Sequence, residues 1–268
     1  MRNNFFGKFI ILLFLMFFIS KNCYGALGDI VNSWMSPSFS PMGLAWDGTY
    51  LWNADNFSDK IYKLDPSTGS ILDSFDSPGD LPRGLTFVGS DLWNIDLTTR
   101  SFYSINPIIG LPWNLEFSKP GNDYFGLTYD GTNLWANDPF GGGDIISKMD
   151  LAGNVISSFP APAGDPSALA WDGTYLWSSD VGTDRIYKLD PSTGAVLDSF
   201  AAPNDQTTGL TFDGTYLWAV DPMTLQVSQI DINLNPTPAP DGIATILTML
   251  GGMGGWAGLR RLRLRRKS

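Results

Sequence analysis

Histidine is absent from this 268-residue sequence, and cysteine and glutamate occur once each, as Cys23 and Glu116. Beyond position 23 the chain therefore offers no ligand set for zinc, haem or copper, because those metals require histidine or cysteine. Thiol catalysis and a nucleophile paired with a histidine base are excluded for the same reason. Disulfides cannot stabilise the body of the chain either, so its stability must come from a hydrophobic core, which about 215 residues suffice to form.

The first 25 residues have the composition of a secretory signal peptide. Two cations, Arg2 and Lys8, precede an unbroken apolar run at 9–19, and the small residues Cys23 and Gly25 suit a signal-peptidase cut. The run has 11 residues, whereas a membrane-spanning helix needs about 20. We therefore expect signal peptidase to remove residues 1–25 from a protein exported across the inner membrane.

The C-terminal end has three parts: a Pro-rich linker at 236–241, an apolar segment at 242–259 and a basic tail at 260–268. The segment has 18 residues, enough to cross a membrane, and the six cations that follow it should stay in the cytoplasm, with the body of the protein outside. With Pro240-Asp241-Gly242 at its start, this end resembles the PEP-CTERM sorting tails of Gram-negative bacteria, in their Pro-Asp-Ser/Gly form.

The PEP-CTERM resemblance implies a route for the protein. The inner membrane would hold the chain through 242–259 until an exosortase-like enzyme removes the tail. The body would then be delivered to the cell envelope, the outer surface or an extracellular matrix. An ordinary uncleaved membrane anchor explains the same residues, so both readings stay open.

Between these ends the chain is strongly acidic. Residues 26–240 contain 26 of the 27 Asp and Glu residues but only 8 of the 17 Lys and Arg residues, a net charge of −18. A surface this acidic repels nucleic acid and anionic lipid, and it favours solubility and association with cations. We expect no nucleic-acid partner.

A repeat of about 42 residues occurs five times. Its copies begin 41, 42, 42 and 41 residues apart, with the segments 43–52, 84–93, 126–135, 168–177 and 209–218. In the first copy, alternating hydrophobic residues and two turn sequences, Asp-Gly and Asp-Pro-Ser-Thr-Gly, predict strands at 44–46, 50–55, 60–64 and 70–75. Four antiparallel strands per copy, without a helix signal, are typical of a β-propeller blade.

The start of the mature chain is predicted to close the ring. Residues 30–37 align, at the repeat offset of 41, with 71–78, which contain a fourth strand, whereas the last copy has only its first three strands. A strand at about 30–37 should therefore complete the last blade and remove the exposed edges of an open array. The predicted fold is all-β: a closed five-bladed β-propeller over 26–235, with four antiparallel strands in each blade.

The repeats resemble the NHL and YVTN groups of propeller repeats. Residues 43–75 and 168–200 match their pattern throughout, whereas the second copy has Val88-Gly89 for Asp-Gly and a different later turn at 106–110. The resemblance implies the fold but not the function, because this fold serves enzymes, scaffolds and ligand sensors. The recurring Gly-Leu and Leu-Trp pieces also resemble, more faintly, five-bladed glycosidases and glutaminyl cyclases. That resemblance implies an alternative function: an envelope hydrolase or cyclase that uses Asp residues at the channel mouth.

Two residue types recur in every copy. The tryptophans are Trp52, Trp93, Trp135, Trp177 and Trp218, and the aspartates three residues later are Asp55, Asp96, Asp138, Asp180 and Asp221. We interpret the tryptophans as packing between blades rather than as a surface for stacking carbohydrate. Each aspartate is interpreted as a cap on its own turn. A ring of carboxylates around a cation is the alternative for the aspartates.

Calcium is the metal that oxygen-only ligands would suit, although no stretch follows the EF-hand loop. The candidate pairs are Asp55 with Asp59, Asp138 with Asp144, and Asp180 with Asp184. No other cofactor is expected.

The residues just before the first strands should surround the channel mouth, and there the copies differ. They are Met42, Arg83, Phe125, Ser167 and Thr208, and the neighbouring loops add Arg100, Phe57, Lys119, Tyr124 and Phe140. Cations and aromatic rings on an acidic body suit a small anionic or carbohydrate ligand. Neutral sequence divergence of the loops explains the same differences between the copies. We predict a non-enzymatic binding or scaffold propeller whose partner is a protein or such a ligand. Glu116 is expected on the rim, away from the axis.

Overall fold

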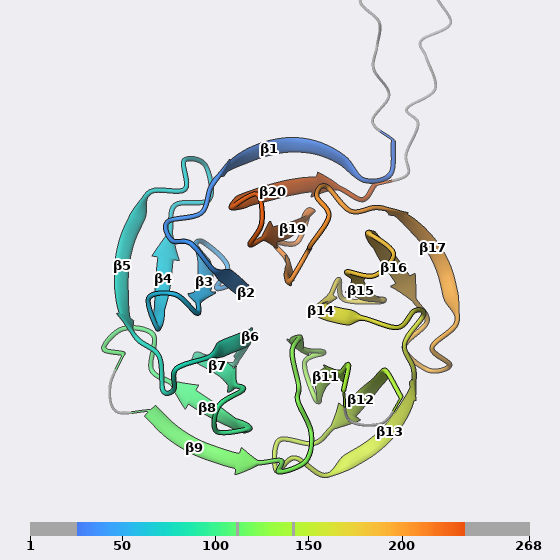
Figure 1. The fold of residues 1–268 in the computed structure, drawn as a ribbon, viewed down its shortest axis with the longest axis horizontal. Helices are drawn as coiled ribbons and strands as arrows, with labels where there is room; N and C mark the ends of the chain where they lie inside the picture. Colours follow the sequence, from blue (N-terminus) through green and yellow to red (C-terminus); the bar gives the residue numbers. More distant parts are fainter. Residues whose placement is uncertain (1–25, 111–112, 141–142, 234–268) are drawn as a thin grey trace, which may run out of the picture. The chain divides into compact units, whose positions relative to one another are not determined.

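The computed structural model describes residues 26–110, 113–140 and 143–233, all of which belong to one compact unit. These ranges contain twenty strands in five four-stranded antiparallel sheets, which surround a central axis as the blades of a propeller (Figure 1). The predicted five-bladed, all-β fold is confirmed.

The predictions for the two ends of the chain lie outside the described residues. These are the signal peptide at 1–25, the linker at 236–241 with its motif Pro240-Asp241-Gly242, the segment at 242–259 and the basic tail at 260–268. Within the described ranges, no helix is long and apolar enough to cross a membrane.

Each blade runs outward from the axis in chain order. Blade 1 consists of β2 (Pro41–Trp46), β3 (Leu51–Asp55), β4 (Lys60–Leu64) and β5 (Ile71–Asp76). Blade 2 consists of β6 (Pro82–Val88), β7 (Asp91–Asp96), β8 (Ser101–Ile105) and β9 (Trp113–Ser118). Blade 3 consists of β10 (Leu127–Tyr129), β11 (Leu134–Asp138), β12 (Ile145–Met149) and β13 (Val155–Pro160). Blade 4 consists of β14 (Pro166–Trp171), β15 (Leu176–Asp180), β16 (Arg185–Leu189) and β17 (Val196–Ala201).

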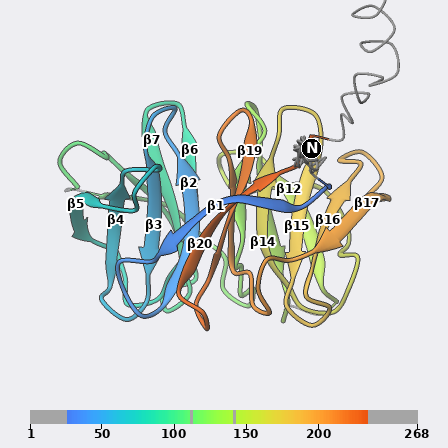
Figure 2. The same ribbon diagram turned by 90° about the horizontal axis from the view of Figure 1, so that it is seen from above.

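Blade 5 is built from both ends of the described chain. It contains β18 (Gly209–Phe212), β19 (Tyr216–Asp221) and β20 (Gln226–Asp231), and β1 (Asp29–Met35) forms its outer strand. β1 pairs antiparallel with β20, from Asp29 opposite Asp231 to Met35 opposite Gln226. Seen edge-on in Figure 2, β1 crosses the outside of the ring beside β20. The predicted closure by the N-terminal strand is confirmed.

Because the strands of a blade are antiparallel, successive connections fall at opposite ends of the ring. We call one end the hairpin face; it carries the turns between the first and second strands of each blade, such as 47–50 in blade 1. The other end is the mouth face. It carries the connections from one blade to the next and the turns between the second and third strands, such as 56–59.

The core lies between the blades, where the repeated tryptophans pack. Trp52, Trp135, Trp177 and Trp218 are at most 1% exposed and Trp93 is 5% exposed. Trp52, for example, packs with Ala54 of its own blade and with Leu85 and Leu92 of blade 2. Truncating a tryptophan this buried costs about 3–5 kcal/mol. The prediction that these residues form the inter-blade core is confirmed.

A carboxylate in the hairpin fixes the tryptophan of the same blade. Asp47 Oδ1 accepts the backbone amides of Thr49 and Tyr50 at 2.8 and 2.7 Å, and its Oδ2 accepts the indole N–H of Trp52 at 2.8 Å. Equivalent indole bonds join Trp135 to Asp130, Trp177 to Asp172 and Trp218 to Asp213. Blade 2, which has Val88 at this position, carries no aspartate for the same bond.

Candidate functional site

Five buried aspartates hold the loops of the mouth face in place. Asp55, fully buried, accepts the amide of Ser40 at 2.8 Å on one oxygen and that of Ser58 at 2.8 Å on the other. The same two-sided arrangement recurs at Asp96, Asp180 and Asp221. At Asp138, Oδ1 accepts the amides of Asp123 and Phe140, and Oδ2 accepts the side-chain amide of Asn122. Each carboxylate thus ties the connection entering its blade to the turn after its second strand. The contacts are those of the turn-capping interpretation.

The second member of each calcium pair has a backbone role. Asp59, Asp144 and Asp184 have φ values of 51° to 53°, in the left-handed region, and Arg100 and Leu225 share that conformation at the equivalent positions. Aspartate adopts this conformation more readily than most residues, which explains its recurrence there. Across the ranges that the structure describes, no three His, Cys, Asp or Glu side chains come together in a group that would hold a metal ion.

Arg83 is the charged residue of the mouth, which we define by the five residues at the starts of the inner strands. Its guanidinium carbon lies 4.5 Å from the centroid of the Phe125 ring, and its Nη1 lies 3.0 Å from Sδ of Met42. Its Nε is buried without a hydrogen-bond partner among the described residues. No described carboxylate is within ion-pair distance of Arg83, and burial lowers the pKa of its guanidinium.

The mouth residues of neighbouring blades contact each other in sequence. Met42, Arg83 and Phe125, from blades 1, 2 and 3, form one continuous set. The other two use their hydroxyls to hold neighbouring backbone: Ser167 donates to the carbonyl of Thr207, and Thr208 donates to that of Pro41 at 3.3 Å. The structure therefore divides the mouth into a cationic and aromatic half on blades 1 to 3 and a structural half on blades 4 and 5.

Arg100 does not join the Arg83 set. It lies in the turn between β7 and β8, is half exposed, and its Nε binds Asp123 at 2.7 Å. Of the other loop residues, Phe140 extends the aromatic side by an edge-on contact with Phe125 at 5.5 Å between centroids. Phe57, 69% exposed, instead packs edge-on against Phe39, and Tyr124 is buried in the core.

Three buried amides lie directly behind this half of the mouth, and they are missing from the residues predicted for the site. Asn53 and Asn94 donate to the carbonyls of Gly43 and Gly84, and Asn137 accepts the amide of Gly126. All three side chains are fully buried, and the second polar atom of each has no hydrogen-bond partner among the described residues. They belong to blades 1, 2 and 3. The signal in the sequence is an Asn one or two residues after the repeated Trp, in these three copies only.

Glu116 lies where the sequence placed it. It is in β9, the outer strand of blade 2, and accepts a hydrogen bond from Ser104 at 2.6 Å. The aspartates nearest the mouth are those that bind the loop amides. The alternative of an enzyme that uses Asp residues at the mouth gains no specific support from these contacts.

Comparisons with known proteins agree with the propeller architecture. No protein-family model matches the chain, and no curated protein sequence matches it. Among solved structures, glutaminyl cyclase from Myxococcus xanthus aligns with a TM-score of 0.63 and 14% identity, over 77% of this chain and 97% of that one. A chain of a nidogen/laminin complex aligns with a TM-score of 0.52 and 20% identity, over 72% and 76%. Virginiamycin B lyase from Staphylococcus aureus aligns with a TM-score of 0.47 and 18% identity, over 74% of this chain and 68% of that one.

These similarities establish the class: the chain is a five-bladed β-propeller repeat protein. At 14% to 20% identity they do not carry a function across. One neighbour is an enzyme and another belongs to a protein complex, so the fold alone leaves both kinds of function available.

Proposed function

We propose that the protein is a non-enzymatic binding propeller, and that Arg83 at the mouth binds the anionic group of a small ligand or partner. The observation that carries the proposal is a half-buried guanidinium without a carboxylate partner, in a body whose net charge is −18. The other two described arginines have oxygen acceptors, Asp123 for Arg100 and Ser199 for Arg185, whereas the buried Nε of Arg83 has no partner.

The surroundings of Arg83 favour an anion over other ligands. Partial burial has removed water from one side of the guanidinium, and in such a site a charge–charge interaction is several times stronger than in bulk water. Because no internal ion pair must be broken, an incoming carboxylate or phosphate gains the full interaction. Phe125 and Met42 hold the guanidinium in place, so little side-chain entropy is lost on binding. The distant acidic residues of the body repel an anion at this site only weakly, because salt screens exposed charges beyond about 10 Å.

The experiment measures binding of simple anions to the purified protein. Citrate, glucuronate and inorganic phosphate are titrated by calorimetry against wild type, Arg83→Lys and Arg83→Gln, with Arg100→Gln as the matched control. At least one anion should bind wild type and Arg100→Gln alike. Arg83→Gln should bind it about 10- to 100-fold more weakly, because one charge-assisted hydrogen bond contributes about 1.5–3 kcal/mol. Equal binding by wild type and Arg83→Gln, or no binding of any of the three anions, would refute the proposal.

We also propose that the propeller is exported and displayed at the cell envelope or in an extracellular matrix. The support is the composition of residues 1–25 and 236–268, which resembles a signal peptide and a sorting tail. Mass spectrometry of the natural protein tests this. We expect an N-terminus at Ala26 and a C-terminus close to Pro240; an intact tail would leave an uncleaved anchor as the correct reading.

A further inference from the structure

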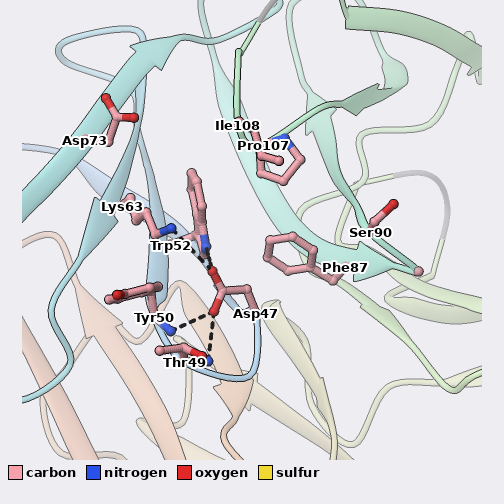
Figure 3. A pocket seen from close by; sticks show the side chains of 11 residues that line it. Asp47, Thr49, Tyr50, Trp52, Lys63, Asp73, Phe87, Ser90, Pro107 and Ile108 are labelled. Atoms are coloured by element: carbon pink, nitrogen blue, oxygen red, sulfur yellow. Dashed lines mark hydrogen bonds and ion pairs between the residues drawn. The ribbon is translucent and has the colours of Figure 1, made fainter.

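A pocket of about 420 Å³ opens between blades 1 and 2 on the hairpin face, at the opposite end of the ring from the mouth. Figure 3 shows the side chains that line it. Its blade 1 wall is polar and includes Asp47, Lys63 and Asp73. Its blade 2 wall is largely apolar, with Phe87, Pro107 and Ile108. Its volume is in the range of small-molecule sites, which runs from about 300 to 1,000 Å³.

The blade 2 wall of this pocket includes a departure of the second copy from the repeat. Gly89 and Pro107 align with Gly48 and Pro66 of the first copy, but Ile108 stands where the first copy has Ser67, and it lines the pocket. Corresponding pockets between blades 4 and 5, and between blades 5 and 1, have about 230 and 240 Å³. Ile108 is 84% exposed although it is apolar, so the rim of this pocket offers an uncovered apolar surface.

The charges of the pocket select a neutral ligand. Lys63 and Asp73 are directly opposite each other on β4 and β5, and Lys63 Nζ lies 4.0 Å from Asp47 and 4.1 Å from the centre of the Tyr50 ring. Lys63 is already paired with Asp47, and Asp73 on the neighbouring strand adds a second negative charge, so the pocket disfavours an anion, whereas the ammonium disfavours a cation. Donor and acceptor groups side by side suit hydroxyls, because each hydroxyl both donates and accepts hydrogen bonds.

We propose that this pocket binds a neutral sugar ring. One face of such a ring presents C–H groups, which would lie against Phe87 and Pro107, while its hydroxyls would reach Lys63 and Asp73. The alternative occupant is an apolar side chain of a protein partner. Such a side chain would contact the apolar wall but would make no hydrogen bonds to Lys63 or Asp73. The site is independent of the anion site at Arg83, because it lies on the other face and uses no residue of the mouth.

Saturation-transfer NMR and calorimetry with the purified protein test the proposal. The probes are glucose, galactose, N-acetylglucosamine and cellobiose, each raised to tens of millimolar. Two exposed substitutions, Asp73→Asn and Ile108→Ser, should each weaken binding at least fivefold. Their matched controls should not: Asp198→Asn changes the residue opposite Lys188 in the near-identical blade 4, and Ile109→Ser changes the neighbour of Ile108 that does not line the pocket.

The outcomes separate this proposal from the one at the mouth. Arg83→Lys should bind the sugar as wild type does, whatever it does to anions. If none of the four sugars binds, or if Asp73→Asn and Ile108→Ser both bind as tightly as wild type, the sugar site is refuted. If Ile108→Ser alone weakens binding and Asp73→Asn does not, the pocket is an apolar docking site and the sugar proposal is again wrong.

Discussion

The indole Nε1 of Trp177 donates a hydrogen bond to Oδ2 of Asp172 at 2.8 Å, across five residues of the same hairpin. The other oxygen of Asp172 accepts the amides of Thr174 and Tyr175 at 2.8 and 2.7 Å. One carboxylate therefore closes the hairpin turn and satisfies the polar atom of a core tryptophan that is fully buried. Because the bond recurs in four blades, it is a structural element of the repeat.

Replacing Asp172 by alanine should destabilise the protein. The change removes the acceptor of two backbone amides and of the Trp177 indole, and a donor left buried without a partner costs about 1–3 kcal/mol. We expect the free energy of unfolding to fall by about 2–3 kcal/mol, measured by urea denaturation at pH 7. Asp205→Ala, at an exposed aspartate of the connection entering blade 5, should change it by less than about 0.5 kcal/mol. Equal losses in the two variants would show that the hairpin carboxylate is dispensable.

Stability should fall in acid, and Asp130 should account for part of the loss. Burial by itself would raise the pKa of Asp130, but hydrogen bonds from the amide of Asn133, the indole of Trp135, the amide of Thr132 and the side chain of Lys148 outweigh it, so the pKa is lowered. A carboxyl whose pKa is lower in the folded state stabilises the protein above its unfolded pKa, about 3.9. That contribution is lost as the pH falls through the folded value.

The Asp130→Asn variant tests this linkage. Urea unfolding at pH 7, 5, 4 and 3 should show the variant about 1 kcal/mol less stable than wild type at pH 7, where the Lys148 ion pair at 3.1 Å is lost. The difference should begin to shrink below about pH 4, because Asp130 of the unfolded chain then takes up a proton before Asp130 of the folded protein does. Asp91→Asn, on an exposed aspartate, controls for the change in net charge. A difference that stays constant with pH would contradict the lowered pKa.

The fold was largely predictable because it repeats. The strands predicted at 50–55, 60–64 and 70–75 correspond to β3, β4 and β5 within one residue, since alternation and turn residues mark both ends of each. The inner strand was predicted to begin at 44 but begins at Pro41. Its register shifts between Pro41 and Leu44, and an irregularity of this kind interrupts the alternation that a sequence pattern relies on.

The site was predictable only in part, because its members are distant in sequence. Met42, Arg83 and Phe125 were placed at the mouth by their repeat positions, and the structure brings them together. Nothing in the sequence showed that Arg100 would form an ion pair with Asp123 while Arg83 would have no carboxylate partner. The Asp-Gly pattern predicts only a turn role for the hairpin carboxylates. The additional signal, which indicates their bond to the indole, is a tryptophan five residues after the aspartate in four copies.

Replacing Gly43 by alanine should disturb both the ring and the mouth. A Cβ at Gly43 would clash with the backbone carbonyl oxygen of Arg83 and would lie 3.0 Å from the amide nitrogen of Leu85. Backbone of a neighbouring blade cannot rotate away as a side chain can, so the inner strands of blades 1 and 2 must move apart. We expect the free energy of unfolding to fall by about 2–3 kcal/mol, the upper range for overpacking, as measured by urea denaturation.

The fourth blade supplies the matched control for Gly43, because Ala168 occupies the same repeat position and its methyl group is already buried there. Ala168→Gly should cost only about 0.5–1 kcal/mol, the usual penalty for glycine in a strand. The two variants also differ in their predicted effect on ligands. Gly43→Ala displaces the strand that carries Arg83, so it should weaken anion binding as well as stability, whereas Ala168→Gly acts on the structural half of the mouth and should leave binding unchanged. If Gly43→Ala costs no more stability than Ala168→Gly, the inner strands of blades 1 and 2 are not in the close contact on which the position of Arg83 depends.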